Sequence, residues 1–262
     1  MIKDIFPIPA FTDNYIWAFH DHDSRSACVV DPGAAQPVLD YLQSAGLELT
    51  HVLITHHHAD HTGGLAELAR QFNLTVYGPT NCAVKEITQR LDDGDRIEVF
   101  GVGFQVLAIP GHTLDHIGYF AASPGDQPNP LVFCGDTLFA AGCGRIFEGN
   151  PAMMYSSLQR LAHLDGNTRI YCTHEYTLAN LKFASAVQPA NSNVMNRVKQ
   201  EAAKRNNSQP TLPSTLAMEL ATNPFLRCSD PELACIAEQK AGQSLASPVD
   251  VFATLRTWKD NF

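Results

Sequence analysis

Residues 52–64 join a short apolar strand to a dense cluster of metal-ligand side chains. His56, His58, Asp60 and His61 follow the strand within six residues, and two glycines then open a helical pattern. Residues two apart on an extended chain point the same way, so the first two histidines can share one metal ion. The aspartate and the last histidine lie where the chain turns toward the helix and can reach a second ion.

A run of histidines can also be a solvent-exposed loop or a tag-like segment. Tags lie at chain ends, and they lack an apolar strand before them and a Gly-Gly helix start behind them. The context therefore favours metal ligands. His57 points away from its neighbours along an extended chain, so we expect it to support the ligands or the fold rather than to bind metal.

Three later segments have a similar format, in which an apolar strand leads to a ligand-type residue: His112, Asp136 and His174. Each residue alone is as often structural as functional. Together with the first cluster they supply five histidines and two aspartates at the carboxyl ends of strands, where α/β folds tend to place sites. Imidazole and carboxylate ligands without thiolate favour zinc, iron(II) or manganese over copper or an iron–sulfur cluster.

Strand and helix patterns alternate up to about residue 174, which predicts a layered α/β domain over residues 1–174. A helix is predicted at 35–45, with Gly46 as its C-terminal cap. The remainder, 175–262, predicts a small all-helical domain without strands. Its expected helices are 178–187, 193–205, 214–221, 231–241 and 249–258.

Composition narrows the function classes. Hydrophobic residues make up 45% and charged residues 17% of the 262 residues, an ordinary globular profile. A net charge of −9 disfavours nucleic acid and anionic membrane as partners. The first ten residues do not form a secretory signal, and no apolar run reaches the ~18 residues of a membrane span. Seven cysteines without a C-x-x-C pair predict reduced thiols in a cytoplasmic protein, with a catalytic cysteine as the weaker alternative. We expect a monomer.

The pattern H-x-H-x-D-H, followed by G-H-T, G-D-T and a later strand-end histidine, resembles the metallo-β-lactamase superfamily. More narrowly, the chain resembles the glyoxalase II family of hydroxyacylglutathione hydrolases. The resemblance runs from end to end and implies an αββα sandwich followed by a smaller all-α C-terminal domain. The matching segments are 12–17, 30–33, 55–64, 110–113, 134–139, 142–145, 174–177, 223–227 and 259–262.

The resemblance also implies a binuclear centre of two divalent ions, with zinc first and iron or manganese as alternatives. The implied ligands are His56, His58 and His112 for one ion, Asp60, His61 and His174 for the other, and Asp136 as the bridge. A bridging hydroxide would then attack the thioester of S-D-lactoylglutathione or a related 2-hydroxyacyl glutathione thioester. The two catalytic aspartates would act as ligands rather than as an acid and base pair. Asp31 resembles a carboxylate that orients a ligand histidine, although a turn residue is an equal interpretation.

Glutathione is net negative, so its binding calls for cationic side chains. The resemblance assigns this role to Arg145, Tyr176, Arg256 and Lys259. For the last two, a solvated helix face is the alternative. Two departures from the family pattern stand out: arginine at 145, where lysine is frequent, and Phe147, where an aromatic hydroxyl can occur.

Other functions on the same fold remain as alternatives. A β-lactamase typically has a cysteine ligand where this chain has Asp136, and a nuclease needs a basic groove that a chain at −9 does not predict. An oxygen-reducing di-iron relative has a carboxylate where His58 stands. A persulfide-oxidising relative lacks most ligands of the second site. A non-catalytic metal protein is a further alternative, disfavoured because structural sites are closed.

Overall fold

The computed structural model describes residues 2–125 and 128–262, and these form two compact units. The first unit comprises Met1–Ala108, Asp115–Gly135 and Tyr171–His174, and the second comprises Ile109–Leu114, Asp136–Ile170 and Glu175–Phe262. The chain therefore passes between the units several times. The predicted division at residue 174 follows the order of the sequence instead, and it stays a prediction.

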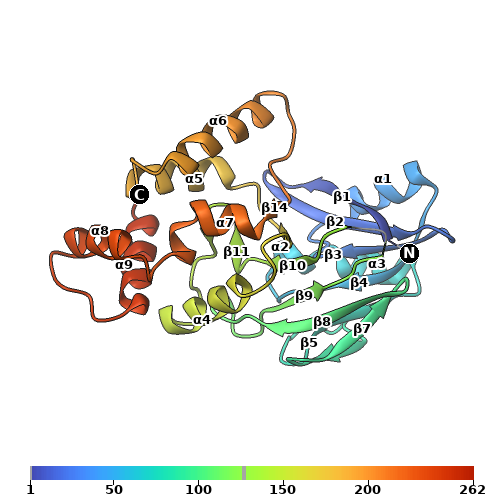
Figure 1. Ribbon diagram of the computed structural model, residues 1–262. Coiled ribbons are helices and arrows are strands. Elements are labelled where there is room, and N and C mark those ends of the chain that lie inside the picture. The colour runs from blue at the N-terminus through green and yellow to red at the C-terminus, as the bar shows by residue number, and fades with distance from the viewer. Residues whose placement is uncertain (1, 126–127) are drawn as a thin grey trace. The chain divides into compact units, whose positions relative to one another are not determined.

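The first unit contains a six-stranded sheet in the order β1-β2-β3-β4-β5-β6. Antiparallel pairing joins the first three strands, and parallel pairing joins the rest. Helix α1 (Ala35–Ala45) and helix α3 (Leu65–Gln71) pack on this sheet through a shared apolar core (Figure 1). The strands are β1 (Ile2–Ala10), β2 (Asn14–Asp21), β3 (Ser26–Val30), β4 (Glu48–Leu53), β5 (Thr75–Pro79) and β6 (Gln89–Leu91).

Helix α1 has the bounds that the sequence predicts. It ends at Gly46, whose φ of 67° is left-handed, and the Gly46 N–H donates to carbonyls of the last turn. Glycine adopts this conformation without the steric cost of a Cβ, so the cap is confirmed. Val38 and Leu42 lie on one face of the helix and are fully or almost fully buried, which accounts for the helical spacing of its apolar residues.

A second six-stranded sheet has the order β14-β13-β10-β9-β8-β7, and its strands β7 to β10 belong to the first unit. Aromatic side chains fill the space between the two sheets. Phe19 of β2 stacks on Phe133 of β10 with 5.8 Å between ring centroids, and Trp17 meets Tyr171 at 4.9 Å. The two sheets therefore pack face to face. The strands are β7 (Arg96–Val99), β8 (Val102–Ala108), β9 (Ile117–Ala121), β10 (Leu131–Gly135), β13 (Arg169–Cys172) and β14 (Ser214–Thr215).

Strand β1 has no counterpart in the sequence predictions. Two prolines, Pro7 and Pro9, interrupt an otherwise strand-like pattern, and proline cannot donate a hydrogen bond within a sheet. The structure accommodates both because β1 is the edge strand, paired only with β2. Edge positions are where sheets tolerate proline.

The second unit is mainly helical. Side chains cap most of its helices: Asn150, Asn191, Thr215, Asp230 and Ser247 each accept a hydrogen bond from a first-turn N–H. Helices α5 and α6 pack together, as do α8 and α9 (Figure 1). The helices are α4 (Pro151–Ala162), α5 (Thr177–Val187), α6 (Ser192–Asn206), α7 (Leu216–Thr222), α8 (Pro231–Ala241) and α9 (Pro248–Asp260), with the short 3-10 helix η1 (Pro224–Leu226).

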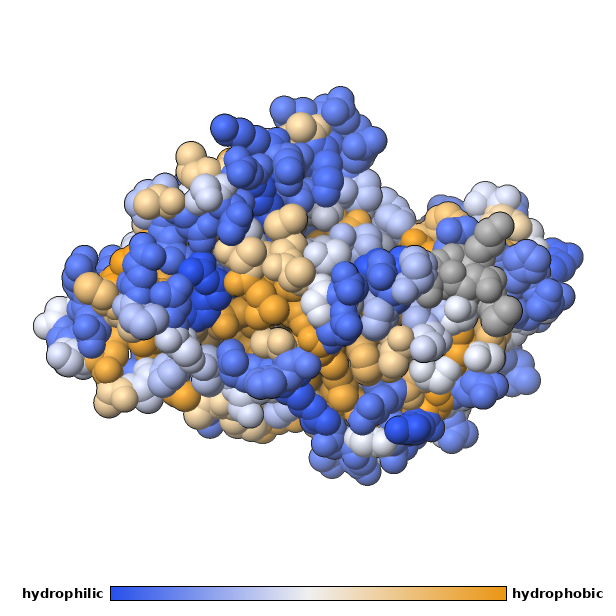
Figure 2. Space-filling model, in the orientation of Figure 1, coloured by the Kyte–Doolittle hydropathy of each residue, from blue (hydrophilic) through white to orange (hydrophobic). Residues whose placement is uncertain are grey.

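The face of α6 turned to the viewer is mostly hydrophilic (Figure 2). Among the described residues, no helix is both long and apolar enough to cross a membrane.

The prediction that no strand follows residue 175 is wrong. Residues 214–215 form the two-residue strand β14 (Ser214–Thr215), which pairs with Arg169 and Ile170 of β13 before α7 begins. So short a strand has no periodicity for the sequence to reveal. The second unit also contains a small hairpin, β11 (Leu138–Phe139) and β12 (Gly142–Cys143), which directly follows Asp136 in the chain.

Candidate metal centre

Asp31 links the carboxyl ends of β3 and β4, the two central strands of the first sheet. It follows β3 with a φ of 53° and is buried. Its carboxylate accepts hydrogen bonds from the Thr55 N–H at 2.8 Å and the Thr55 hydroxyl at 2.7 Å, and it lies 3.0 Å from Nδ1 of His61. Asp31 therefore contacts His61 as its predicted orienting role requires, and the role of His61 as a metal ligand stays a prediction. The turn conformation and the orienting role belong to the same residue.

His56 and His58 direct their rings to one point. Nε2 of His56 lies 3.2 Å from Nδ1 of His58, as the two-residue period of an extended chain predicts. His56 is fully buried, and its Nδ1 lies 3.0 Å from the Thr55 hydroxyl. Its ring also stacks on His116, with 4.6 Å between centroids. Packing and hydrogen bonding together fix the direction of this imidazole.

Asp60, His61 and His174 form a second group in the same unit. The Oδ2 atom of Asp60 lies 3.5 Å from Nε2 of His61 and 3.4 Å from Nε2 of His174, and the candidate ligand atoms all lie within 4.8 Å of one another. Asp60 and His61 belong to the one-turn helix α2 (Ala59–Thr62), where the chain leaves the extended conformation, as predicted. The far nitrogen of His174, Nδ1, lies 2.7 Å from Oδ1 of Asp13.

Three residues of this region were not predicted as functional: Asp13, Asn14 and His116. Asn14 donates to Oδ2 of Asp60 at 3.2 Å, and its backbone bridges to His174. Asp13 and Asn14 lie in the segment 12–17 that carried the resemblance, but nothing in their spacing links them to a histidine 161 residues further along. The sheet topology supplies that link, because β2 brings the turn after β1 to the end of β13.

His57 contacts a different partner from those of its two neighbours. Its Nδ1 lies 3.0 Å from Oδ1 of Asp115, and the Asp115 side chain is almost completely buried. This contact anchors the middle of the histidine run to the segment that leads into β9. It is compatible with the supporting role predicted for His57, which stays a prediction.

His112 and Asp136 meet in the second unit. Nε2 of His112 lies 3.4 Å from Oδ2 of Asp136, and both residues are buried. Nδ1 of His112 donates to the carbonyl of Arg145 at 2.8 Å. The close path of the chain requires glycine at 144, because a Cβ there would lie 1.9 Å from the carbonyl oxygen of Asp136. This glycine lets the chain cross Asp136 and deliver the Arg145 carbonyl to His112.

The predicted substrate-binding cations gather around one carboxylate of the second unit. Arg145 is exposed, and its Nε lies 3.8 Å from Oδ1 of Asp260. Arg256 donates to the same oxygen at 2.8 Å and to the Cys143 carbonyl at 3.0 Å. The Arg256 side chain is 7% exposed, so it does not lie on a solvated helix face, which was the alternative to substrate binding. Its bonds to backbone and carboxylate explain why it can be buried.

Lys259 completes this cluster. Burial lowers the pKa of its ammonium, and the nearby Arg256 and Arg145 lower it further. Its Nζ donates to the Ala179 carbonyl at 3.3 Å. Three cations therefore surround Asp260, and the balance of charge is positive. Tyr176 lies separately, with its ring 5.5 Å from that of Phe139 and more than a third of its surface exposed.

Family models cover nearly the whole chain. Residues 15–174 match the metallo-beta-lactamase superfamily, and residues 175–262 match the hydroxyacylglutathione hydrolase C-terminus. The hydroxyacylglutathione hydrolase of Hahella chejuensis is 51% identical over 261 residues, a match that covers 100% of both chains. The chain belongs to the hydroxyacylglutathione hydrolase family. The glyoxalase II resemblance of the sequence is thereby confirmed.

Solved structures agree with this family. ETHE1 from Myxococcus xanthus has a TM-score of 0.65 and 26% identity, covering 99% of this chain and 98% of that one. A second structure, of a protein in a di-iron-bound form, has a TM-score of 0.57 and 25% identity, covering 84% and 99%. The expected fold class, a metallo-β-lactamase sandwich followed by a helical C-terminal domain, is confirmed.

The donor set of this family member fits divalent metal ions. Imidazole nitrogens and carboxylate oxygens supply the clusters, and four of the imidazoles have their Nδ1 held by a protein oxygen. Such contacts fix the ring and leave Nε2 for a metal. The histidine and aspartate clusters on this fold bind divalent metal ions.

The cysteines offer no comparable chemistry. All seven are free, and six are buried. Burial raises the pKa of the Cys28, Cys143 and Cys228 thiols, and it raises the pKa of Cys82 to about 11. A thiol acts as a nucleophile only as the thiolate. These four groups are therefore protonated at neutral pH, which supports the prediction that no cysteine is the nucleophile.

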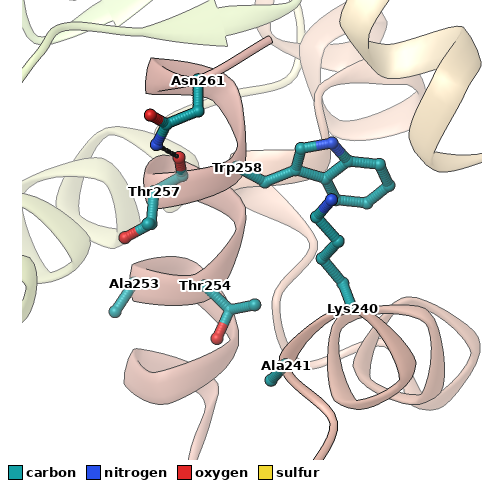
Figure 3. Close-up of a pocket in the computed structure, with 7 residues that line it drawn as sticks. All are labelled: Lys240, Ala241, Ala253, Thr254, Thr257, Trp258 and Asn261. Carbon is teal, nitrogen blue, oxygen red and sulfur yellow. Dashed lines mark hydrogen bonds between the residues drawn. The ribbon is translucent and has the colours of Figure 1, made fainter.

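A separate groove lies between α8 and α9 (Figure 3). It has a volume of about 450 Å³, and the ammonium of Lys240 lies over the ring of Trp258 at 4.7 Å. None of the four predicted substrate-binding residues lines this groove. Helix α9 therefore presents one face to the groove and contributes Arg256 and Lys259 elsewhere.

Proposed function

We propose that this chain hydrolyses S-D-lactoylglutathione and related 2-hydroxyacyl glutathione thioesters to glutathione and a 2-hydroxy acid, D-lactate for the first. This is the second step of methylglyoxal detoxification. The observation that carries the proposal is the full-length identity of 51% to a hydroxyacylglutathione hydrolase. The C-terminal family match supports the substrate class, since that region is specific to the same enzyme family.

Two divalent ions serve the reaction, with zinc as the proposed metal and iron or manganese as alternatives. The proposed ligands are His56, His58 and His112 for one ion, Asp60, His61 and His174 for the other, and Asp136 for both. The di-iron form of a structural relative supports a binuclear site. Bound divalent ions lower the pKa of water to roughly 7 and polarise a carbonyl oxygen.

The residues of the chain prepare this chemistry by holding the ligands. Asp31 and Asp13 lie against Nδ1 of His61 and His174, so each ring keeps its Nε2 lone pair available. Asp60 and Asp136 act as ligands and not as a general acid and base. No strong acid is required, because a thiolate leaving group with a pKa of ~8.5 departs readily.

The cation cluster of the second unit binds the carboxylates of glutathione. Arg145 and Lys259 are the proposed direct contacts. Arg256 supports them by holding Asp260 and the Cys143 carbonyl, and it adds positive charge. Tyr176 contributes an exposed hydroxyl. In this proposal, residues 1–174 form the catalytic domain and residues 175–262 form the substrate-binding domain. The free thiols support a cytoplasmic location, and the acidic net charge supports a small-molecule substrate rather than nucleic acid. A monomer is proposed as the acting form.

A comparison of substrates tests the proposal. Metal-replete protein is assayed with S-D-lactoylglutathione, a β-lactam and a phosphodiester, and thiol release is followed for the first. We expect turnover of the thioester alone and elemental analysis near two metal ions per chain. Hydrolysis of the lactam or phosphodiester in preference to the thioester would overturn the proposed substrate. Full activity with a single ion per chain would overturn the binuclear site.

A further inference from the structure

The turn of the β11–β12 hairpin holds a residue in an unfavourable backbone conformation. Ala141 has a φ of 56°, in the left-handed region that disfavours residues with a Cβ. Its N–H donates to Oε2 of Glu219 at 2.7 Å, and the preceding carbonyl, of Ala140, accepts from Asn180 at 3.1 Å. Side chains from α5 and α7 therefore hold a conformation that the alanine alone would not favour.

Asn223 holds the same turn from both sides. Its Nδ2 donates to the Phe139 carbonyl at 3.2 Å and to the Gly142 carbonyl at 2.8 Å. The two strands of this hairpin have two residues each, too few for a stable ladder of their own. The Asn223 side chain, more than eighty residues further along the chain, supplies hydrogen bonds that the ladder lacks.

Glu219 is itself fixed by a buried ion pair. Its Oε1 atom accepts from Nη2 of Arg197 at 2.6 Å and from the Ser214 hydroxyl. Arg197 also donates to the Thr222 hydroxyl at 2.6 Å, and all four of these side chains are buried. One carboxylate oxygen thus serves the ion pair, while the other serves Ala141 and Asn223.

The hairpin leads directly to a metal-ligand contact. After Cys143, the chain crosses Asp136 at Gly144 and presents the Arg145 carbonyl to Nδ1 of His112 at 2.8 Å. A carbonyl can fix the tautomer of an imidazole only if its own backbone is held in place. The clamp on the turn is therefore also a clamp on His112.

We propose that Glu219 and Asn223 are positioning residues for His112. They act through the β11–β12 hairpin, by holding the Arg145 carbonyl where it fixes the His112 ring. This inference rests on the proposed function, because it takes His112 as a metal ligand. It assigns a role in the site to a buried network that contains none of the seven proposed ligands.

The central variant is Glu219→Gln, which keeps the shape of the side chain. Its amide can accept from Arg197 or from Ala141, but not from both. The first readout is hydrogen exchange of residues 138–144 in the metal-free full chain, which requires neither metal nor activity. We expect at least a tenfold loss of protection. The second readout is zinc affinity by chelator competition, for which we expect about a tenfold loss.

A matched control and a rescue separate positioning from general stability. Glu201→Gln removes a buried carboxylate of α6 whose ion-pair partner is Lys204 of the same helix, and we expect both readouts to stay near wild type. Adding Ala141→Gly to Glu219→Gln should recover most of the zinc affinity, because glycine adopts a positive φ readily. If the double variant recovers nothing, the network has only a structural role and the proposal fails.

The remaining outcomes also decide whether the positioning role holds. If Glu219→Gln does not fold, Asn180→Ala replaces it, since this variant removes only the bond to the Ala140 carbonyl, and a smaller loss in both readouts is expected. If His112→Ala leaves zinc affinity unchanged, the metal assignment of the proposed function is wrong. If His112→Ala lowers zinc affinity while Glu219→Gln and Asn180→Ala do not, the positioning role alone is overturned.

Discussion

The two units hold their histidines by different means. In the first unit, carboxylates lie against Nδ1 of His61 and His174, supplied by Asp31 and Asp13. In the second unit, a backbone carbonyl accepts from Nδ1 of His112. A carboxylate raises the basicity of the imidazole and is encoded by one residue. A carbonyl depends on the conformation of its whole segment. The first arrangement therefore depends on single side chains, and the second depends on the packing of a whole backbone segment.

The largest effect is expected at Asp31. Asp31→Asn retains a residue type that tolerates a positive φ, but its amide offers only one acceptor oxygen where the carboxylate offers two. Depending on which oxygen remains, the variant loses either the bond from the Thr55 N–H or both the bond from the Thr55 hydroxyl and the contact with His61. We expect zinc affinity to fall about 100-fold and the free energy of unfolding to fall by about 1.5–3 kcal/mol. Chelator competition and urea unfolding measure these changes.

Asp40→Asn is the control for Asp31→Asn, because Asp40 is an exposed carboxylate of α1 that accepts from Gln36. It should change neither quantity. If Asp31→Asn bound zinc as tightly as wild type, carboxylate support would not distinguish the first unit from the second.

A smaller effect is expected at Asp13, whose side chain is about a third exposed. Asp13→Ala removes the partner of His174 but leaves the ligand itself, so zinc affinity should fall about tenfold with little loss of stability. Asp23→Ala is the matched control, because Asp23 lies 3.4 Å from a histidine that is not a proposed ligand, His22. Equal zinc affinities for the two variants would show that the Asp13 contact does not support metal binding.

The smallest effect on metal affinity is expected at Lys259, which lies outside both histidine groups. Lys259→Ala should leave zinc affinity unchanged and raise KM for the glutathione thioester about tenfold, since the residue is half-buried and binds through charge. Lys182→Ala is the control, because the Lys182 and Lys259 ammonium groups both lie near the Phe262 ring. A fall in kcat together with zinc content would instead place Lys259 in support of the metal site.

The same residue predicts a pH dependence. Burial, followed by Arg256 and Arg145, lowers the pKa of the Lys259 ammonium below the ordinary 10.5. The binding form is the protonated one, which is lost as pH rises through the lowered pKa. KM should therefore begin to rise at a lower alkaline pH than for an ordinary lysine. Lys259→Arg, which stays charged, should remove this rise, and an unchanged profile would contradict the assignment.

The sequence predicted the part of the site that is encoded locally. Strand alternation places His56 and His58 on one side, and the turn toward α2 sets apart Asp60 and His61. Each of these relations spans only a few residues, so the period of the backbone is sufficient to predict it. Strand-end positions for His112, Asp136 and His174 also followed from apolar runs.

The unpredicted part depends on chain topology. Asp13 meets His174 only because the sheets bring their segments together. A carbonyl such as that of Arg145 carries no sequence signal, since every residue has one. Arg256 lies on one face of α9, and residues along a helix have the same spacing whether that face is solvated or buried. The sequence pattern alone therefore does not reveal the burial of Arg256. Its burial follows from partners at Cys143 and Asp260, and only the first is remote in sequence.

The prolines of β1 have a consequence for self-association. Pro7 pairs with Trp17 and Pro9 with Tyr15, and residues two apart present their nitrogens on the same side of a strand. Proline is tolerated in a sheet where its nitrogen faces the open edge, so this edge lacks donors at two successive outward positions. A strand that approached this edge could not form a complete ladder of backbone hydrogen bonds with β1. The two prolines therefore disfavour pairing between this edge of β1 and a strand of another molecule.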